Sequence, residues 1–362
     1  MANRARQPAA STEDEVRQPM ETDAVAREHR LLRYLLIAAK VALSAGLIYY
    51  AFGKIDISDA WRQIAGIRAY SVAATAVLLG AQLGFSALRL SRILASLGCR
   101  CRLSQALDVA FIGAFFSQAF ISFVGGDAMR IWGIVRAGAP VGLAARAVVL
   151  DRVAGLAGML ILVLLTLPSL LYLVRDPGMR VGLLAALVMG IAGFVALGLL
   201  KHMPRALTRM RPVQWLAQLS ATALSFARSP RTSGELLGLS IIIQIFNVGI
   251  FYVIAAGLSV DIRLWQCLLL VPPVMFLSML PISFAGWGVR EGAVIVAFSL
   301  VGVPAGQIVT VSVFFGLSVL AVSLPGALLW LVQRGQGMSL EGVEWEASIY
   351  TVDKTSRQDM RQ

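Results

Sequence analysis

The chain has 362 residues, of which 58% are hydrophobic and only 14% are charged, and its mean hydropathy of +0.76 lies far outside the range of ordinary soluble domains. This composition excludes a soluble globular protein and leaves room for about six to eight membrane spans of about 20 residues. The formal net charge of +12 would suggest nucleic-acid binding in a soluble chain. Here the arginines lie between apolar segments, where the positive-inside rule and anionic lipid headgroups explain them, so we expect no nucleic-acid partner.

Cysteine and histidine are too few and too scattered for the chemistry that they usually support. Cys99 and Cys101 flank an arginine and Cys267 stands alone, so neither a disulfide framework nor a zinc site is predicted. His29 lies in the N-terminal tail and His202 in a loop, which leaves no material for a metal centre or a Ser-His-Asp arrangement. No G-x-x-x-x-G-K-[ST] motif occurs either. We therefore expect no metal and no cofactor.

The N-terminal part of the chain comprises a polar tail and a first membrane span. Residues 1–30 are mixed in charge and contain prolines, which is typical of a disordered tail. The apolar segment 31–52 is too long and too far from the start for a cleavable signal peptide, and the arginines before it place the tail in the cytoplasm. Lys40 lies nine residues inside this span, about 13 Å at about 1.5 Å per residue, so we expect it to face the bundle interior.

The next part of the chain predicts a span and a re-entrant hairpin. Residues 69–88 form a second span, followed by a loop that has four arginines and no acid and is therefore cytoplasmic. Segment 104–124 is long enough to cross the membrane, but crossing would place the later basic loop 201–231 outside the cell. The conflict disappears if the chain enters from the cytoplasm, breaks at Gly125-Gly126 and returns to the same side through residues 128–145.

The remaining full spans are predicted at residues 147–174, 181–200, 236–258 and 307–332. Within the basic loop, one helical face is apolar and comprises Trp215, Leu216, Leu219, Ala223 and Phe226. This face indicates either an amphipathic helix on the inner leaflet or a plain connecting helix.

A second hairpin is predicted from residues 264–280 and 292–303, which flank a break at residues 281–291. It enters from the face opposite to the first hairpin. The expected fold is thus all-α and polytopic: a transmembrane domain over residues 31–332, with about six full transmembrane helices plus two re-entrant helical hairpins in an inverted repeat, and a polar cytoplasmic tail over 333–362. Eight plain spans are the alternative, at the cost of a misplaced basic loop.

Short internal matches support a repeat. Ile121–Arg130 reads ISFVGGDAMR and Ile282–Arg290 reads ISFAGWGVR, the same string less one residue. Gly138-Ala139-Pro140 follows the first copy as Gly302-Val303-Pro304 follows the second, and residues 167–171 resemble 324–328. Matches of this length also arise by chance in a chain rich in leucine, alanine and glycine.

Charged residues within the apolar region are candidates for function, because a charge near the bilayer centre costs about 2.5–3.5 kcal/mol on insertion scales. Asp127 and Arg130 lie on one turn after the glycine pair Gly125-Gly126. Either Asp127 only caps a helix with Arg130 as its partner, or Arg130 binds a phosphate in a membrane cavity. Asp151 and Arg152 stand early in their span, where an interfacial pair and a functional pair are both open.

The second hairpin tip has similar chemistry, with the residues Gly286, Gly288, Arg290 and Glu291. If the two tips meet near the midplane, they form one polar site with arginines from both halves. Gln244 and Asn247 share a helical face and either line this cavity or join helices.

These elements resemble the lysylphosphatidylglycerol synthase transmembrane, or flippase-like, family. That family has a Gly-Gly-Asp-x-x-Arg element, a Glu-Arg pair and a Pro-x-S-x-x-G-x-G-V-R-E element. Here they read Gly125-Gly126-Asp127-Ala128-Met129-Arg130, Asp151-Arg152 and Pro281-Ile282-Ser283-Phe284-Ala285-Gly286-Trp287-Gly288-Val289-Arg290-Glu291. Asp151 departs from the usual glutamate, which keeps the charge and shortens the reach.

The resemblance implies a multi-pass protein of the bacterial inner membrane, with both termini cytoplasmic, that translocates a phospholipid or glycolipid. The site residues would be the two tips, the Asp151-Arg152 pair and Lys40. No synthase or transferase domain is expected beside the membrane region, because fewer than 35 polar residues lie beyond each end of it. The alternatives are a membrane enzyme on a lipid-linked substrate, with Asp127 or Glu291 as base, and an accessory subunit of a lipid-modifying enzyme.

Overall fold

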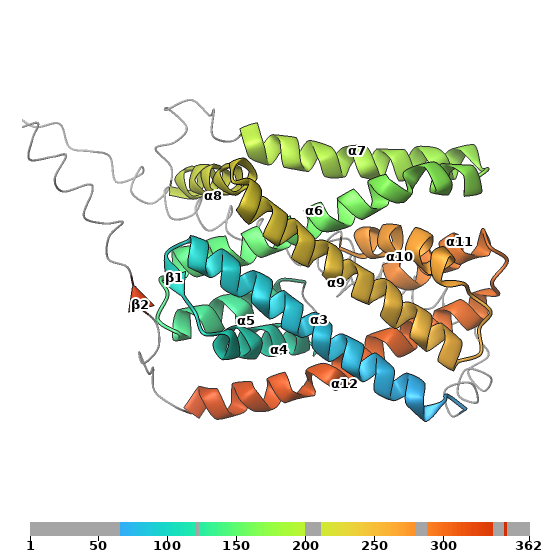
Figure 1. Cartoon of the computed structure of the whole chain (residues 1–362), viewed down its shortest axis with the longest axis horizontal. Coiled ribbons are helices and arrows are strands. Elements are labelled where there is room, and N and C mark those ends of the chain that lie inside the picture. The colour runs from blue at the N-terminus through green and yellow to red at the C-terminus, as the bar shows by residue number, and fades with distance from the viewer. Residues whose placement is uncertain (1–65, 120–122, 200–210, 280–287, 336–343, 346–362) are drawn as a thin grey trace, which may run out of the picture.

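The computed structural model describes residues 66–119, 123–199, 211–279, 288–335 and 344–345. This part of the chain is almost entirely helical, as predicted (Figure 1). Its helices are α3 (Ala69–Ser96), α4 (Leu103–Ala119), α5 (Phe123–Arg136), α6 (Val141–Leu173), α7 (Pro177–Leu199), α8 (Arg211–Arg228), α9 (Pro230–Gly257), α10 (Leu264–Ser278), α11 (Val289–Ser299) and α12 (Ala305–Gly335). The predicted span 31–52, Lys40 and Gly286 lie outside the described residues.

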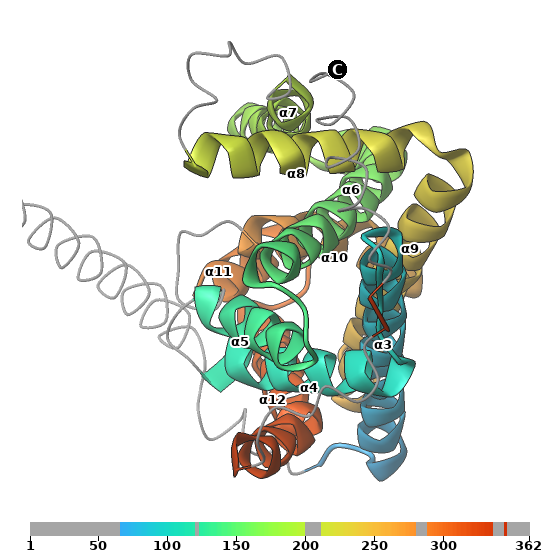
Figure 2. The same ribbon diagram turned by 90° about the vertical axis from the view of Figure 1, so that its left-hand side faces the viewer.

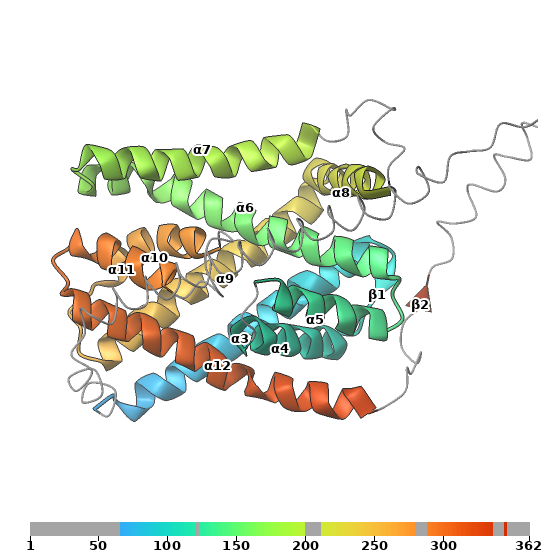
Figure 3. The same cartoon turned by 180° about the vertical axis from the view of Figure 1, so that it is seen from behind.

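Five of the described helices, α3, α6, α7, α9 and α12, are long and apolar enough to cross a membrane. They correspond to five of the six predicted full spans. In Figures 1 and 3 they run along the long direction of the bundle, and α3 and α9 lie side by side in opposite directions. The all-α polytopic fold class is therefore confirmed.

Two pairs of shorter helices occupy opposite ends of the bundle. α4 and α5 have 17 and 14 residues, whereas α10 and α11 have 15 and 11. At about 1.5 Å per residue, even the longest reaches only about 25 Å, short of a hydrocarbon core of about 30 Å. The α4–α5 pair lies in one half of the molecule and the α10–α11 pair in the other (Figures 1 and 3). This is the arrangement expected of two hairpins of opposite entry.

The predicted break at Gly125-Gly126 is wrong, because both glycines lie inside α5. A Cβ atom on Gly126 would collide with the Ser117 hydroxyl and lie 2.7 Å from the Gly113 carbonyl oxygen of α4. The glycine therefore serves close packing of two helices, which is a common use of small residues in membranes. The return arm is also shorter than predicted, since α5 ends at Arg136 and α6 begins at Val141.

The two short turns after α5 and α11 have the same geometry. Gly138 and Gly302 both adopt positive φ, 103° and 78°. The following residue in each turn donates its N–H back into the preceding helix, from Ala139 to Ile134 and from Val303 to Phe298, both at 3.2 Å. Each turn is a glycine C-cap, and a proline then leads into the next long helix. The short sequence match at these positions therefore corresponds to matched structure.

Packing between the two halves is reciprocal. α4 packs against α12 and α10 packs against α6. Close contact of α4 with α12 depends on Gly326, where a Cβ atom would overlap the Phe111 carbonyl group, and on the edge-to-face rings of Phe116 and Trp330. These contacts enclose the centre of the bundle between helices from both halves.

Helix α8 crosses the end of the bundle, as Figure 2 shows. Its predicted apolar face is present: Leu219 is buried, and Trp215, Ala223 and Phe226 pack against the same cluster. Leu216 is instead exposed. Because this face packs on protein, the structure favours a connecting helix over one lying on the leaflet.

A small pair of strands joins the C-terminal region to the loop between α3 and α4. β1 (Cys99–Arg100) pairs antiparallel with β2 (Glu344–Trp345). Glu344 and Trp345 thus lie beside the basic loop that follows α3.

Candidate functional site

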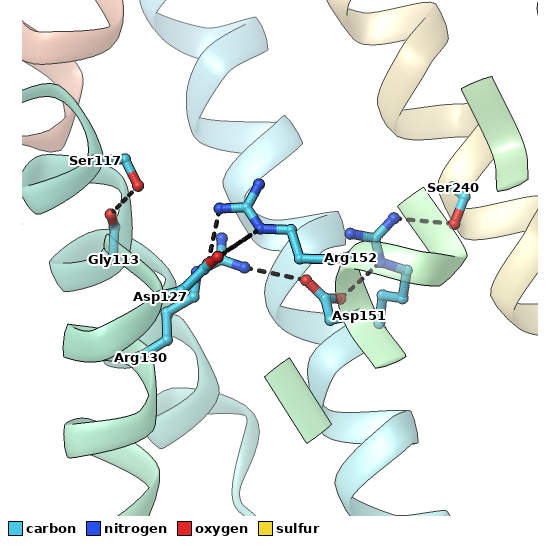
Figure 4. Close-up of polar contacts among 8 residues, drawn as sticks. Gly113, Ser117, Asp127, Arg130, Asp151, Arg152 and Ser240 are labelled. Carbon is cyan, nitrogen blue, oxygen red and sulfur yellow. Dashed lines mark hydrogen bonds and ion pairs between the residues drawn. The ribbon is translucent and has the colours of Figure 1, made fainter. Parts of the chain in front are cut away.

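The first candidate tip and the acid-base pair of α6 form one cluster of crossed ion pairs. Arg130 of α5 donates to Asp151 of α6 at 3.0 Å, and Arg152 of α6 donates to Asp127 of α5 at 2.7 Å. Figure 4 shows these side chains meeting between the two helices. Asp127 is the fifth residue of α5 and therefore not its N-cap. The interpretation of Asp127 as a mere cap with Arg130 as its partner is wrong, because each residue pairs with the opposite helix.

Asp151 is the centre of this cluster. It is only 1% exposed, because α6 begins ten residues before it rather than four. Arg89 of α3 donates to its second carboxylate oxygen at 2.8 Å and also to the Ser240 hydroxyl of α9 at 2.9 Å. Asp151 is therefore not exposed on the protein surface: this side chain joins three helices in the protein interior.

Sequence reasoning missed Arg89, which it counted among the cytoplasmic arginines of a loop. α3 continues to Ser96, so Arg89 lies within the helix and is 6% exposed. Its place against α6 depends on Gly155, where a Cβ atom would lie 3.2 Å from a guanidinium nitrogen. The available signal was the continuous apolar pattern around Arg89, since a leucine stands on each side of it.

The cluster carries more positive than negative charge. Within the described residues, Arg89, Arg130 and Arg152 pair with two carboxylates, Asp127 and Asp151. In addition, the Nε atom of Arg130 is buried and has no hydrogen-bond partner within the described part of the chain. Buried polar atoms are normally satisfied, so this donor and the excess charge together favour binding of an anion.

A cavity of about 320 Å³ lies beside the cluster, and Arg130 and Arg152 form part of its wall. The other polar residues that line it come from α3, α4 and α9 and are Gln82, Ser86, Ser117, Gln118 and Asn247. Asn247 accepts a hydrogen bond from Gln82 at 2.7 Å and donates to Gln244 at 2.9 Å. Asn247 thus joins α3 to α9 and also lines the cavity, as both interpretations of this residue predicted. Gln244 contributes to the contact between the helices through its bond with Asn247.

The second tip forms a separate buried network at the start of α11. Arg290 donates to Glu291 at 2.7 Å, and both also contact the Ser312 hydroxyl of α12. Glu291 accepts the Gly288 N–H at 2.6 Å and so caps its own helix, while Gly288 adopts a φ of 85°. The predicted charge pair at a half-helix start is therefore present at this position.

The structure does not bring Arg290 to the wall of the cavity. Phe315 of α12 lies between them: its ring lines the cavity and its centroid lies 5.5 Å from the Arg290 guanidinium carbon. The prediction of one site with arginines from both tips is therefore met only in part. Arg130 and Arg152 line the cavity, and Arg290 lies behind an aromatic ring.

Residues 37–326 match the family model described as "Lysylphosphatidylglycerol synthase TM region". The match covers every residue of both ion-pair clusters and all the polar residues of the cavity wall. No curated protein matches the chain.

Proposed function

Because the chain belongs to the lysylphosphatidylglycerol synthase TM region family, and is thus a multi-pass membrane protein linked to lipid metabolism, we propose that it translocates an anionic phospholipid or glycolipid. The headgroup binds in the cavity between the two halves of the bundle. The observation that carries the proposal is the pair Arg130 and Arg152 on the cavity wall, in a cluster where three guanidinium groups share two carboxylates.

A phosphate fits this wall on electrostatic and geometric grounds. Arginine offers planar pairs of N–H donors that match phosphate oxygens, and such charge-assisted bonds strengthen where water is scarce. Arg130 has a buried Nε–H to give, and the Arg152 side chain is 29% exposed, which leaves room for an approaching ligand. The ion pairs with Asp151 and Asp127 hold Arg130 and Arg152, respectively, in place.

The paired architecture supports an inverted repeat of α3–α6 with α9–α12. Its support is the antiparallel α3 and α9, the short helix pairs at opposite ends, the matched glycine turns and the reciprocal packing of α4 on α12 and α10 on α6. Transporters with such repeats open their central site alternately to the two sides by moving one unit against the other. In this proposal the α4–α5 and α10–α11 pairs are re-entrant hairpins.

The proposed setting is the bacterial inner membrane, with both ends of the chain in the cytoplasm. The basic loop after α3 and the segment that pairs with it in β1 and β2 lie on that side. Energy for transport would come from the lipid gradient, an ion gradient or a partner enzyme that supplies or consumes the lipid.

The proposal is tested with purified protein in liposomes that contain acyl-labelled phosphatidylglycerol. We expect labelled lipid to cross the bilayer, with at least tenfold slower transfer for Arg130→Gln and Arg152→Gln. Arg146→Gln is the matched control: within the described residues, Arg146 bonds only the Gly142 carbonyl on its own helix, and it does not line the cavity. A new covalent lipid species in mass spectra of the extracted lipids would replace transport by an enzymatic function. Equal transfer rates in the wild type and the three variants would show that the two arginines of the cavity wall do not take part in transport.

A further inference from the structure

The cavity wall contains two cationic side chains and several uncharged polar ones, set among apolar residues. Arg130 and Arg152 come from α5 and α6, whereas Gln82, Gln118 and Asn247 come from α3, α4 and α9. A ligand that pairs with both kinds of polar side chain needs an anionic group and uncharged groups that form hydrogen bonds.

Two buried atoms of this wall lack partners within the described residues, the Nε atom of Arg130 and the Oε1 atom of Gln118. The first is a donor that suits a phosphate oxygen. The second belongs to an amide, which donates or accepts according to its orientation. A hydroxyl group satisfies the amide in either orientation, because it is both donor and acceptor.

The carboxylates near the cavity are already bound to arginines. Asp127 accepts from Arg152, Asp151 from Arg89 and Arg130, and Glu291 from Arg290. None of the described residues that line the cavity is acidic. A positively charged headgroup would therefore meet two arginines and, among the described residues of the wall, no free carboxylate to pair with.

We propose that the cavity selects lipids whose headgroup is a phosphate ester bearing uncharged hydroxyls, such as a phosphoglycerol or a phosphorylated sugar, over lipids whose phosphate carries an ammonium group. The proposal rests on the proposed function and narrows its substrate class. An ammonium must lose its hydration on entering a low-dielectric site, and the nearby guanidinium groups add repulsion. Hydroxyls avoid both costs and form hydrogen bonds with the amides of the wall.

The test compares acyl-labelled lipids of equal net charge in proteoliposomes of the full chain. Phosphatidylglycerol, phosphatidylinositol and phosphatidylserine each carry one net negative charge, but only the last has an ammonium group. We expect the first two to cross at least tenfold faster than phosphatidylserine. Equal or faster movement of phosphatidylserine would overturn the selectivity and leave the translocase proposal standing.

Binding is measured separately, so that the headgroup preference of the cavity is determined even if no transport is observed. Thermal unfolding of the protein in detergent is followed with added phosphatidylglycerol, phosphatidylserine or soluble glycerol 3-phosphate. We expect the largest upward shift in Tm with phosphatidylglycerol. Equal shifts with the two lipids would overturn the selectivity, and a shift with glycerol 3-phosphate alone would assign the site to a free phosphate ester. Preferential binding of phosphatidylglycerol without any transport would support the selectivity and contradict the proposal that the protein is a translocase.

A substitution at Gln118 tests the chemistry directly. Gln118→Glu adds a carboxylate to the cavity wall, and we expect the rate ratio of phosphatidylglycerol to phosphatidylserine to fall at least tenfold. Gln218→Glu, on an exposed position of α8, is the matched control and should leave the ratio unchanged. Gln118→Leu should slow phosphatidylglycerol without favouring phosphatidylserine. An unchanged ratio in a Gln118→Glu protein whose Tm equals that of the wild type would contradict the proposal.

Discussion

Asp151 of α6 binds Arg130 of α5 with one carboxylate oxygen and Arg89 of α3 with the other, at 3.0 Å and 2.8 Å. One carboxylate that is 1% exposed thus fixes two guanidinium groups from different helices. Arg89 faces away from the cavity toward Ser240, while Arg130 faces the cavity. The two arginines therefore differ in role: Arg89 anchors the carboxylate in the bundle, and Arg130 is the one that would contact a ligand in the proposed function.

Asp151→Asn should destabilise the protein by about 3–5 kcal/mol, because it leaves two buried guanidinium groups without their shared counter-charge. The measurement is thermal or denaturant unfolding of the purified protein in detergent. Asp176→Asn is the matched control: Asp176 caps α7 by accepting the Met179 N–H at 2.7 Å, and asparagine caps equally well. Equal stability of the two variants would show that the Asp151 ion pairs do not hold the bundle together.

Gly126→Ala should also destabilise the bundle, by about 1–3 kcal/mol, because the new Cβ atom meets the fixed backbone oxygen of Gly113. Gly142→Ala on α6 is the control, since within the described residues a Cβ atom at that position would meet no atom from another element within 4 Å. There the helix propensity of alanine should raise stability by up to about 0.5–1 kcal/mol. A Gly126→Ala protein as stable as the control variant would mean that α4 and α5 do not pack closely.

Hydropathy and charge were sufficient to predict the long helices, because each depends on about 20 consecutive residues and on the sign of the flanking loops. They also predicted the positions of the two short pairs. Gly125 and Gly126 were misinterpreted, since glycine breaks helices in water but permits close helix packing in lipid. Arg89 was also misinterpreted. Because it directly follows the predicted span 69–88, it was counted as a cytoplasmic loop arginine, although it lies in α3 and is buried.

The ion pairs between α5 and α6 could not be predicted from sequence patterns. Asp127 and Arg130 are three residues apart, which suggests a local pair on one helix. The actual partners lie 21 and 25 residues away, because α5 and α6 place two acid-base pairs face to face. Likewise, the separation of Arg290 from the cavity by Phe315 depends on how α11 packs on α12, which no local spacing reveals.

Cys101, in the loop between α3 and α4, should react slowly with maleimides at neutral pH. Burial, together with the nearby Cys99 and Asp108, raises the pKa of the Cys101 thiol from an ordinary value of 9.0 to about 11. The thiolate is the reactive form, so its fraction at pH 7.5 is about 100-fold lower than for a free thiol, partly offset by its greater nucleophilicity. We expect a rate roughly tenfold below that of an unfolded control, rising with pH up to about 11. A pH profile that levels off near 9 would contradict the raised pKa.

Cysteines introduced at Val141 and Leu264 separate the hairpin arrangement from eight plain spans. Both positions are exposed, by 63% and 53%, and each lies at the first residue of its helix, α6 and α10. If α4–α5 and α10–α11 are re-entrant, Val141→Cys is reached only from the cytoplasm and Leu264→Cys only from outside. With eight spans both assignments are reversed, because one extra crossing before α6 inverts every later loop as far as α10. The measurement is labelling of intact cells with a membrane-impermeant maleimide, and each variant serves as the control for the other. Labelling of Val141→Cys from outside, with Leu264→Cys protected, would remove the hairpins and with them the structural basis for an inverted repeat.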